Sequence, residues 1–343
     1  MPGKILVTGG TGYIGSHTSV ELIKEGYDVV IIDNLYNSEA EVAGKIGEIT
    51  GKTPVLEVFD LCDREKLFDF FSRHKGIDAV IHFAAYKAVG ESVRKPVAYY
   101  RNNLLSLVNL LDGMKQFNVP GLVFSSSCTV YGQPDKLPVA EDAPLKPAVS
   151  PYGNTKQIGE RIIKDATEAD NSLKAVSLRY FNPIGAHPSA IIGESPNGVP
   201  ENLVPFITQT AIGLRQELKV FGNDYDTPDG SCIRDYLHVC DLARAHTAAV
   251  RRLIEGKNLS ACEVFNLGTG KGVSVLEAIN SFERVSGVKL NYRIVDRRPG
   301  DIEKIWADPS YANTELGWNT IYTLDDAMRS AWEWEKSLAK KRV

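Results

Sequence analysis

A tyrosine and a lysine placed four residues apart form a pair that could move a proton. Among the 14 tyrosines of this 343-residue chain, only Tyr152 has a lysine at that spacing, Lys156. On a helix, residues four apart share a face, so both groups could reach one substrate. A phenol has a pKa near ~10, and a neighbouring cation favours the phenolate, which can act as a base. Chance can also produce such a pair, so the prediction depends on the elements around it.

The residues before Tyr152 predict that a helix starts there. Ser150 is a favourable N-cap, and Pro151 suits the first helical position, where its missing N–H would have no partner within the helix. No further proline occurs before Asp170. We therefore expect the tyrosine to lie on the rigid first turn of a helix.

The amino terminus predicts a strand, a glycine turn and a helix, in that order. An apolar run at 4–7 leads directly into the segment TGGTGYIGS. Gly10, Gly12 and Gly15 match the dinucleotide pattern G-x-G-x-x-G, while Gly9 with the last two gives G-x-x-G-x-x-G, and the sequence leaves both registers open. In either register the turn lets the backbone approach a pyrophosphate, and the helix N-terminus offers it unpaired N–H groups.

A second strand follows at 28–32, and an acidic residue stands at its end. This residue, Asp33, comes 18 positions after Gly15. A carboxylate there accepts hydrogen bonds from the adenosine ribose hydroxyls and repels a 2′-phosphate. We therefore predict that the cofactor is NAD rather than NADP.

The distribution of apolar runs predicts an α/β fold, a doubly wound parallel sheet of the Rossmann type with a smaller C-terminal α/β substrate domain. We assign residues 1–182 to the dinucleotide-binding domain and 183–343 to the substrate domain, with 238–268 returning to the first sheet. Proline, asparagine and glycine crowd the chain after Phe181, as in long loops around a ligand. Further strands are expected at 55–59, 79–83, 122–124, 174–178 and 263–268.

Composition excludes several other classes of protein. The formal charge of −4 argues against nucleic acid or an anionic membrane as a partner, and no apolar stretch approaches the ~20 residues that span a bilayer. No secretory leader precedes the first strand, so we expect a cytoplasmic protein. The six histidines form no cluster, and the cysteines form no C-x-x-C pair, which predicts reduced thiols and no metal. The cysteines are Cys62, Cys128, Cys232, Cys240 and Cys262.

Six segments, in order and at matching separations, closely resemble the UDP-galactose 4-epimerases, a family of extended short-chain dehydrogenase/reductases. The resemblance extends from Lys4 to about Trp334. It implies that a bound NAD oxidises C4 of a UDP-hexose to a ketone and returns the hydride to either face, so that UDP-galactose and UDP-glucose interconvert. The segments are 8–16, 82–92, 124–127, 150–156, 179–183 and 297–301.

The resemblance also implies roles for individual residues. Tyr152 would be the base, Lys156 would hold the nicotinamide ribose, and Ser127 would bond the sugar O4 and relay its proton. The cofactor would be contacted by Gly9, Gly12, Tyr13, Ile14, Gly15, Asp33, Asn34, Asp60, Leu61, Phe83, Ala84, Lys87, Asn102, Ser125, Tyr152, Lys156 and Tyr180.

Two arginines suit the diphosphate of the nucleotide sugar, because a guanidinium group can meet two phosphate oxygens at once. They are Arg234 and Arg298, and surface ion pairs are the alternative interpretation of both. By resemblance, Phe221 would lie beside the uracil and Asp301 at the ribose. The complete substrate set adds Lys87, Ser127, Tyr152, Asn182, Asn202, Leu203, Tyr236 and Ile305.

One position departs from the resembling family. Ile305 stands where members have tyrosine, or a smaller residue such as cysteine, at the wall of the sugar pocket. A tyrosine there excludes an N-acetyl group and a small side chain admits it, so isoleucine leaves the choice open. We favour acceptance of both kinds of sugar.

Two alternative functions and one assembly remain to be considered. Nucleotide-sugar 4,6-dehydratases also oxidise C4, but they have an Asp-Glu pair after the catalytic hydroxyl residue, where Cys128 and Thr129 stand here. A non-catalytic NAD-binding regulatory protein could share the fold, since architecture does not fix activity.

The family commonly forms homodimers through helices of the nucleotide-binding domain. The leucine-rich segment 103–114 could supply that face, although core packing is our first interpretation of it.

Overall fold

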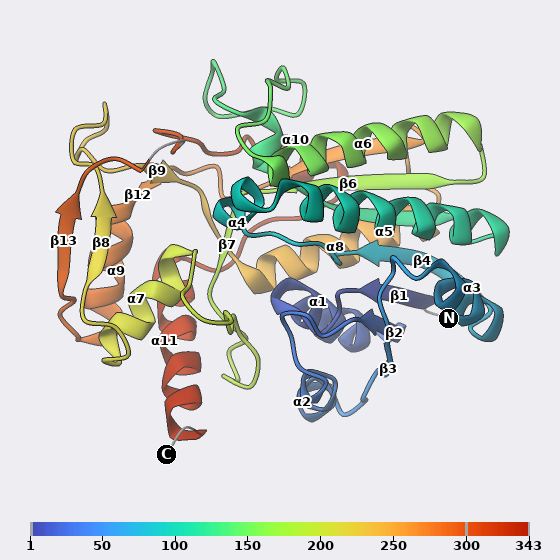
Figure 1. Cartoon of the computed structure of the whole chain (residues 1–343), viewed down its shortest axis with the longest axis horizontal. Helices are drawn as coiled ribbons and strands as arrows, with labels where there is room; N and C mark the ends of the chain where they lie inside the picture. Colours follow the sequence, from blue (N-terminus) through green and yellow to red (C-terminus); the bar gives the residue numbers. More distant parts are fainter. Residues whose placement is uncertain (1–2, 299–300, 342–343) are drawn as a thin grey trace.

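A computed structural model describes residues 3–298 and 301–341. Its centre is a sheet of seven parallel strands in the order β11-β6-β5-β4-β1-β2-β3, which confirms the doubly wound prediction (Figure 1). The strands are β1 (Lys4–Thr8), β2 (Asp28–Asp33), β3 (Val55–Val58), β4 (Ile77–His82), β5 (Gly121–Ser127), β6 (Lys174–Tyr180) and β11 (Cys262–Leu267).

Helices cover both faces of this sheet. Because successive strand residues point to opposite faces, Ile5 and Val7 enter one hydrophobic cluster while Leu6, between them, enters another. The first cluster lies under α1 (Tyr13–Lys24), α2 (Glu41–Thr50) and α8 (Val239–Ile254). The second lies under α3 (Arg64–Arg73), α5 (Pro96–Gln116) and α6 (Pro151–Ala169).

The chain changes face between two neighbouring strands, β1 and β4. The first leads into α1 on one side, and the second leads through α4 (Val89–Arg94) into α5 on the other. The strands stay joined just past their ends, where Phe83 N donates to Thr8 O at 3.0 Å. Open parallel sheets bind ligands at the carboxyl ends of such a switch point. The glycine turn and the residues after β4 are therefore placed together by topology.

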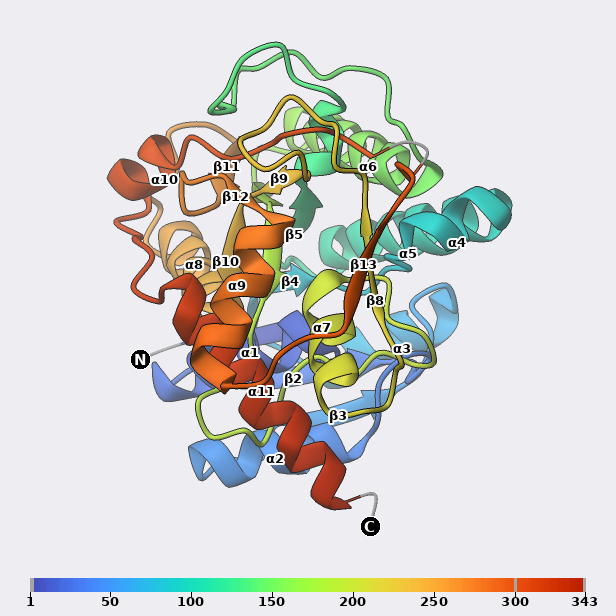
Figure 2. The same ribbon diagram turned by 90° about the vertical axis from the view of Figure 1, so that its left-hand side faces the viewer.

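The second half of the chain forms small sheets and helices beside the main sheet (Figure 2). Within it, β8 pairs in parallel with β13, β7 in parallel with β10, and β9 antiparallel with β12. The strands are β7 (Asn182–Ile184), β8 (Leu218–Phe221), β9 (Ile233–Arg234), β10 (Tyr236–His238), β12 (Val273–Ser274) and β13 (Tyr292–Val295). The helices are α7 (Leu203–Ala211), α9 (Val275–Ser286), α10 (Ser310–Glu315) and α11 (Leu324–Lys341).

A third hydrophobic cluster supports these elements. It joins Ile207 of α7, Phe282 of α9 and Met328 of α11, all fully buried. The chain does not stay in this half: α8 packs against α1, and β11 pairs with β6 as the last strand of the main sheet. Within residues 3–298 and 301–341, no helix is both long and apolar enough to cross a membrane.

Candidate active site

The glycine turn between β1 and α1 is built so that a ligand can reach the backbone. Gly9 has a left-handed φ of 71°, which favours the register that begins with this residue. A Cβ atom on Gly15 would lie 2.2 Å from Gly9 O, so this position needs glycine for packing. A Cβ on Gly12 would meet only Gly9 O, at 3.2 Å, and no side chain caps the helix that starts there. The space beside the N-terminus of α1 is therefore open to an anion.

The acidic residue at the end of β2 has the position expected of a ribose ligand. Asp33 is buried, and its carboxylate accepts hydrogen bonds from Thr11 N at 3.1 Å and Ser38 Oγ at 3.1 Å. These bonds fix the side chain next to the glycine turn and leave it capacity for further donors. Asn34 Nδ2 donates to Asp60 Oδ2 at 3.1 Å, which places these two predicted cofactor residues together.

The other predicted cofactor residues lie along the same edge. Ala84 N would be 2.8 Å from a Cβ on Gly9, so the turn after β4 contacts the glycine turn directly. Tyr13 and Ile14 are the first residues of α1, Leu61 is buried after β3, and Phe83 follows β4. Asn102 lies within α5, where its amide donates to Asn103.

Tyr180, another predicted cofactor residue, directs its hydroxyl to a residue of α8. Its hydroxyl is hydrogen-bonded to His246 Nε2 at 2.7 Å, on the side of the sheet that α8 covers. His246 also packs against the ring of Phe83. The hydroxyl is thus part of the packing beneath the site.

The three predicted catalytic residues meet where β5 ends and α6 begins. Ser150 caps α6 by accepting a hydrogen bond from Gly153 N at 3.1 Å, as predicted, and Tyr152 lies on the first turn. Lys156, one turn later, donates to Ser125 O at 2.5 Å and Ser125 Oγ at 3.2 Å. Ser127 ends β5. The lysine therefore ties the helix to the strand that presents the serine.

Burial controls the protonation of this group. Burial raises the pKa of Tyr152 to about 12, although a hydrogen bond from Ser127 acts in the opposite direction. Burial also lowers the pKa of Lys156 to about 7, against the attraction of the Glu160 carboxylate. Lys156 was expected to bring the pKa of the Tyr152 phenol down toward neutral pH. With the protein residues alone, that expectation is wrong. The lysine Nζ lies 5.9 Å from the centre of the phenol ring, and loss of hydration has the larger effect.

A buried ion pair behind the catalytic strand was not predicted from the sequence. Arg179 of β6 and Glu160 of α6 form a salt bridge at 2.7 Å, and Ser126 Oγ donates to the same carboxylate at 2.5 Å. Glu160 lies one turn after Lys156 on the same helix face. The four-residue spacing between Lys156 and Glu160 was the sequence signal from which Glu160 could have been predicted. The pair supports the serine run of β5 from the face that α6 covers.

On the substrate side, the structure brings several predicted residues together. Arg298 pairs with Asp301 at 2.6 Å and lies over the ring of Phe221, 5.6 Å from its centre. Arg234 donates to the backbone oxygen of Ile233 at 2.8 Å. Pro299 and Gly300, between the two paired residues of the predicted motif, lie outside the described residues.

Four further substrate residues stand at strand and helix ends. Asn182 and Tyr236 are register partners in the β7–β10 pair. Asn202 is the N-cap of α7, and Leu203 is its first residue. Asn202 Nδ2 donates to Glu194 Oε1 at 2.7 Å, and Lys87 Nζ reaches the same oxygen at 3.1 Å. Glu194 was not predicted from the sequence.

Comparison with known proteins identifies the family. Residues 6–331 match a family model described as GDP-mannose 4,6 dehydratase. The UDP-glucose 4-epimerase of Bacillus subtilis is 50% identical over 333 residues, which are 97% of each chain. The chain belongs to the UDP-glucose 4-epimerase family. Two structures of this family are similar: that from Stenotrophomonas maltophila with bound NAD and formylated UDP-arabinopyranose (TM-score 0.96, 47% identity, 99% of each chain), and that from Bifidobacterium longum in complex with NAD+ and UDP (TM-score 0.92, 46% identity, 97% and 98%).

Ile305, the residue that departs from the epimerase pattern, is almost fully buried. Only 2% of it is exposed, and it packs with Tyr131 and Phe181 in a small hydrophobic cluster. Its backbone N–H donates to Ile233 O at 3.2 Å, beside Arg234. The Ile305 side chain is thus fixed against the residues that directly follow β5, the strand that carries the serine run.

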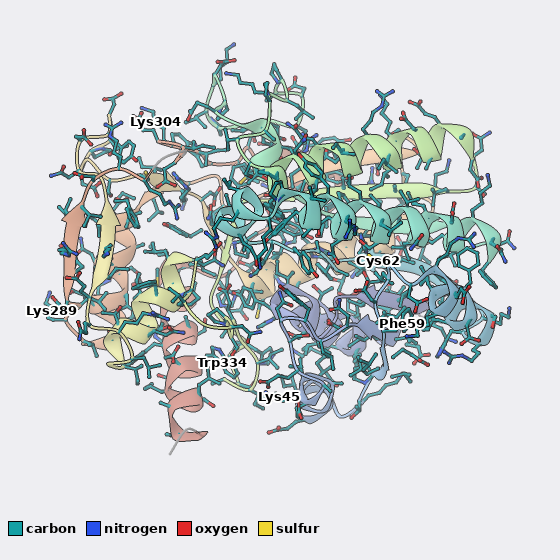
Figure 3. All side chains as sticks on the ribbon, viewed as in Figure 1. Lys45, Phe59, Cys62, Lys289, Lys304 and Trp334 are labelled. Atoms are coloured by element: carbon teal, nitrogen blue, oxygen red, sulfur yellow. The ribbon has the colours of Figure 1, made fainter. Side chains whose placement is uncertain are left out.

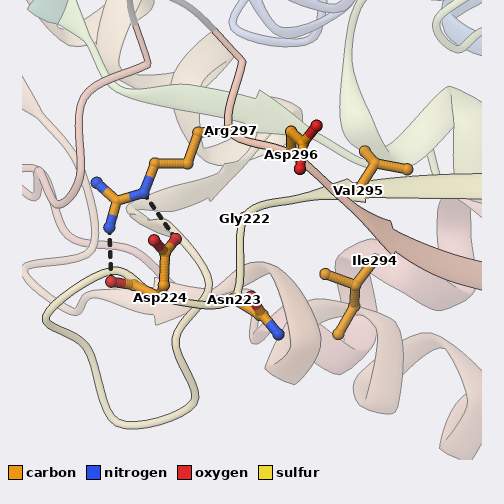
Figure 4. Close-up of a pocket in the computed structure, with 7 residues that line it drawn as sticks. All are labelled: Gly222, Asn223, Asp224, Ile294, Val295, Asp296 and Arg297. Carbon is orange, nitrogen blue, oxygen red and sulfur yellow. Dashed lines mark hydrogen bonds and ion pairs between the residues drawn. The ribbon is translucent and has the colours of Figure 1, made fainter.

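A hollow of about 380 Å³ lies at the ends of β8 and β13 (Figure 4). The Arg297 side chain crosses it to bond Asp224, with Nε 2.7 Å from Oδ1. Of the described residues, its wall includes neither Tyr152 nor Ser127. Its first lining residue, Gly222, directly follows Phe221, the residue predicted to lie beside the uracil.

Two glycine substitutions should separate the structural and ligand roles of the turn. Gly12→Ala keeps an allowed backbone (φ −71°, ψ 174°), so we expect unfolding in urea close to wild type but NAD retention about tenfold lower or worse. Gly15→Ala should cost about 1–3 kcal/mol of stability, because its Cβ has no room. Nucleotide released per protein, measured by absorbance, checks the first. Full NAD content in Gly12→Ala would contradict the assignment of the turn.

Proposed function

We propose that the chain interconverts UDP-galactose and UDP-glucose by inverting C4 with bound NAD. The observation that supports this most is the meeting of Ser127, Tyr152 and Lys156 at the carboxyl edge of the sheet. In this proposal they supply a hydroxyl relay, a proton acceptor and a cation, on the same sheet whose β1 and β2 lead into the glycine turn and end at Asp33. These groups would move the proton, and bound NAD would accept and return the hydride, so that a secondary alcohol could be oxidised and the ketone reduced again.

The protein's own groups would move the proton of the sugar hydroxyl. In this proposal Ser127 bonds O4 of the hexose and passes its proton to Tyr152, and the reverse transfer ends the cycle. Bound NAD supplies the reversible hydride acceptor, and its positive ring favours the phenolate. Lys156 adds a second positive charge and would bond the nicotinamide ribose. Because burial raises the pKa of Tyr152 to about 12, the base needs these cations to work near neutral pH.

Inversion requires the ketone to present its other face while the nucleotide stays bound. Arg234 and Arg298 would hold the diphosphate, and Phe221 would pack on the uracil. These contacts are remote from C4, so the hexose could turn about the bonds to the diphosphate without release. The glycine turn, Asp33 and the residues after β4 fit a cofactor that remains in place through the cycle.

The residues after the serine argue against dehydration as the net reaction. Elimination of water needs an added acid and base, and Cys128 and Thr129 stand at those positions. Burial raises the pKa of the Cys128 thiol to about 12, so it is a neutral thiol at physiological pH. A threonine hydroxyl does not ionise in that range. A purely regulatory NAD-binding role is disfavoured because Tyr152, Lys156 and Ser127 are all present.

Replacing the phenol tests the reaction directly. Tyr152→Phe should convert UDP-galactose on the order of 10²- to 10⁴-fold more slowly while retaining NAD, because only the proton transfer is lost. Tyr292→Phe is the matched control, since Tyr292 is exposed on β13. The sugars are identified by NMR after incubation without added NAD, using substrate deuterated at C4. Wild-type turnover by Tyr152→Phe, or loss of the deuterium to solvent, would refute the mechanism.

We propose that both UDP-hexoses and their N-acetylated forms are accepted. Support comes from Ile305, which is smaller than the tyrosine that family members have there and is buried in a hydrophobic cluster with Tyr131 and Phe181. Ile305→Tyr should then lower the kcat/KM for UDP-N-acetylgalactosamine about tenfold or more and change that for UDP-galactose little. Turnover of only UDP-galactose by the wild-type protein would reject the proposal.

We infer that two copies associate through α4 and α5 in a homodimer. Apolar side chains with high exposed fractions lie along these helices: Val93 (61%), Val97 (67%), Leu105 (41%) and Val108 (40%). Other leucines of α5, such as Leu107 and Leu110, are buried in the core. Val97→Glu should give monomers in sedimentation, whereas Leu259→Glu, on an exposed loop residue, should not. An unchanged mass for Val97→Glu would exclude this face.

The cytoplasm is the location that we propose. All five cysteines are free thiols in the structure, which is the state that a reducing compartment maintains.

A further inference from the structure

One carboxylate oxygen accepts hydrogen bonds from both sides of the site. Lys87, which follows β4 on the cofactor side, donates to Glu194 Oε1 at 3.1 Å. Asn202, the N-cap of α7 on the substrate side, donates to the same oxygen at 2.7 Å. The Glu194 side chain is 11% exposed, whereas that of Lys87 is 52% exposed. The acceptor is therefore more enclosed than the cation that it holds.

The backbone at Glu194 is fixed from two directions. The Trp334 indole of α11, labelled in Figure 3, donates to Glu194 O at 2.9 Å. A Cβ on Gly193 would lie 2.5 Å from the same indole, so the chain passes directly against it. On the other side, Gly193 bridges Ala186, and His187 N donates to Ile192 O at 3.1 Å. Ile192 is buried in the cluster beneath the main sheet.

This arrangement points to positioning rather than to folding stability. An ion pair with an exposed lysine adds little to stability, because water screens it. A rigidly held acceptor shared by two donors has a different effect, since a shift of either donor changes the geometry available to the other. In such a network, the effects of changing two members are not additive.

We propose that Glu194 is a positioning residue that couples the cofactor side of the site to the substrate side through Lys87 and Asn202. The proposal rests on the function above and on the roles that the family resemblance implies, in which Lys87 contacts the cofactor as well as the substrate and Asn202 contacts the nucleotide sugar. Thermodynamic linkage makes the coupling reciprocal, so Lys87 affects the affinity for the UDP-sugar without touching its uridine end.

A double-mutant cycle on the NAD-loaded protein tests the coupling. Glu194→Gln keeps the size and the acceptor for Asn202 but removes the charge that holds Lys87, and Lys87→Met removes the donor. We expect each single change to raise the KM for UDP-galactose about 3- to 10-fold with a smaller change in kcat. The KM of the double variant should be no higher than that of the single variant with the higher KM, because both changes break the same link.

Glu283→Gln is a matched control far from the site. Glu283 of α9 is 13% exposed, accepts a hydrogen bond from Lys289 Nζ at 2.6 Å and also accepts one from Leu290 N at 2.9 Å. Its substitution should leave the KM unchanged. If Glu194→Gln behaves in the same way, or if the effects at Glu194 and Lys87 multiply independently, the coupling is refuted. A wild-type protein that converts no UDP-hexose would instead refute the proposed function, and the inference with it.

Discussion

The hydrogen bonds from Lys156 to Ser125 fix the distance between a helix and a strand, and the site depends on that distance. They join the first turns of α6 to the carboxyl end of β5, where Ser127 is presented. Because β5 lies between β4 and β6 in a buried parallel sheet, the serine cannot move without its neighbours. A lysine that is 4% exposed can stay there only with such partners. The hydrogen bonds to Ser125 offset part of the free-energy cost of burying the ammonium group.

The same burial acts on both titratable groups of the site and opposes their charged forms. Burial raises the pKa of the Tyr152 phenol to about 12, which keeps it neutral near pH 7. It lowers the pKa of the Lys156 ammonium to about 7, where the charged and neutral forms have similar populations. A neutral, water-poor environment strengthens the effect of any charge that a ligand introduces. The positive charge that bound NAD would introduce therefore favours ionisation of a buried Tyr152 more strongly than it would in water.

Local sequence signals were sufficient for the elements and for the positions at their ends. The N-cap Ser150, the glycine turn and Asp33 at the end of β2 were all placed correctly, because each depends on residues within one turn or one strand. The hydrogen bond from Lys87 to Glu194 could not be predicted in this way, since 107 residues separate the partners. The Tyr180 hydroxyl likewise meets His246 across 66 residues. The direction of the Tyr152 pKa was missed because burial is a property of the whole fold and not of the Tyr152–Lys156 spacing.

The return of β11 to the main sheet has a consequence for how the chain can be divided. Since β11 is paired along its whole length with β6, a fragment that stopped at residue 182 would leave β6 as a bare edge strand. Its unpaired amides and the apolar face normally covered by α8 would then invite pairing with other molecules. The main sheet thus becomes complete only after the chain has already formed β7, α7, β8 and β10 of the smaller part. Sequence order and folding unit do not coincide in this protein.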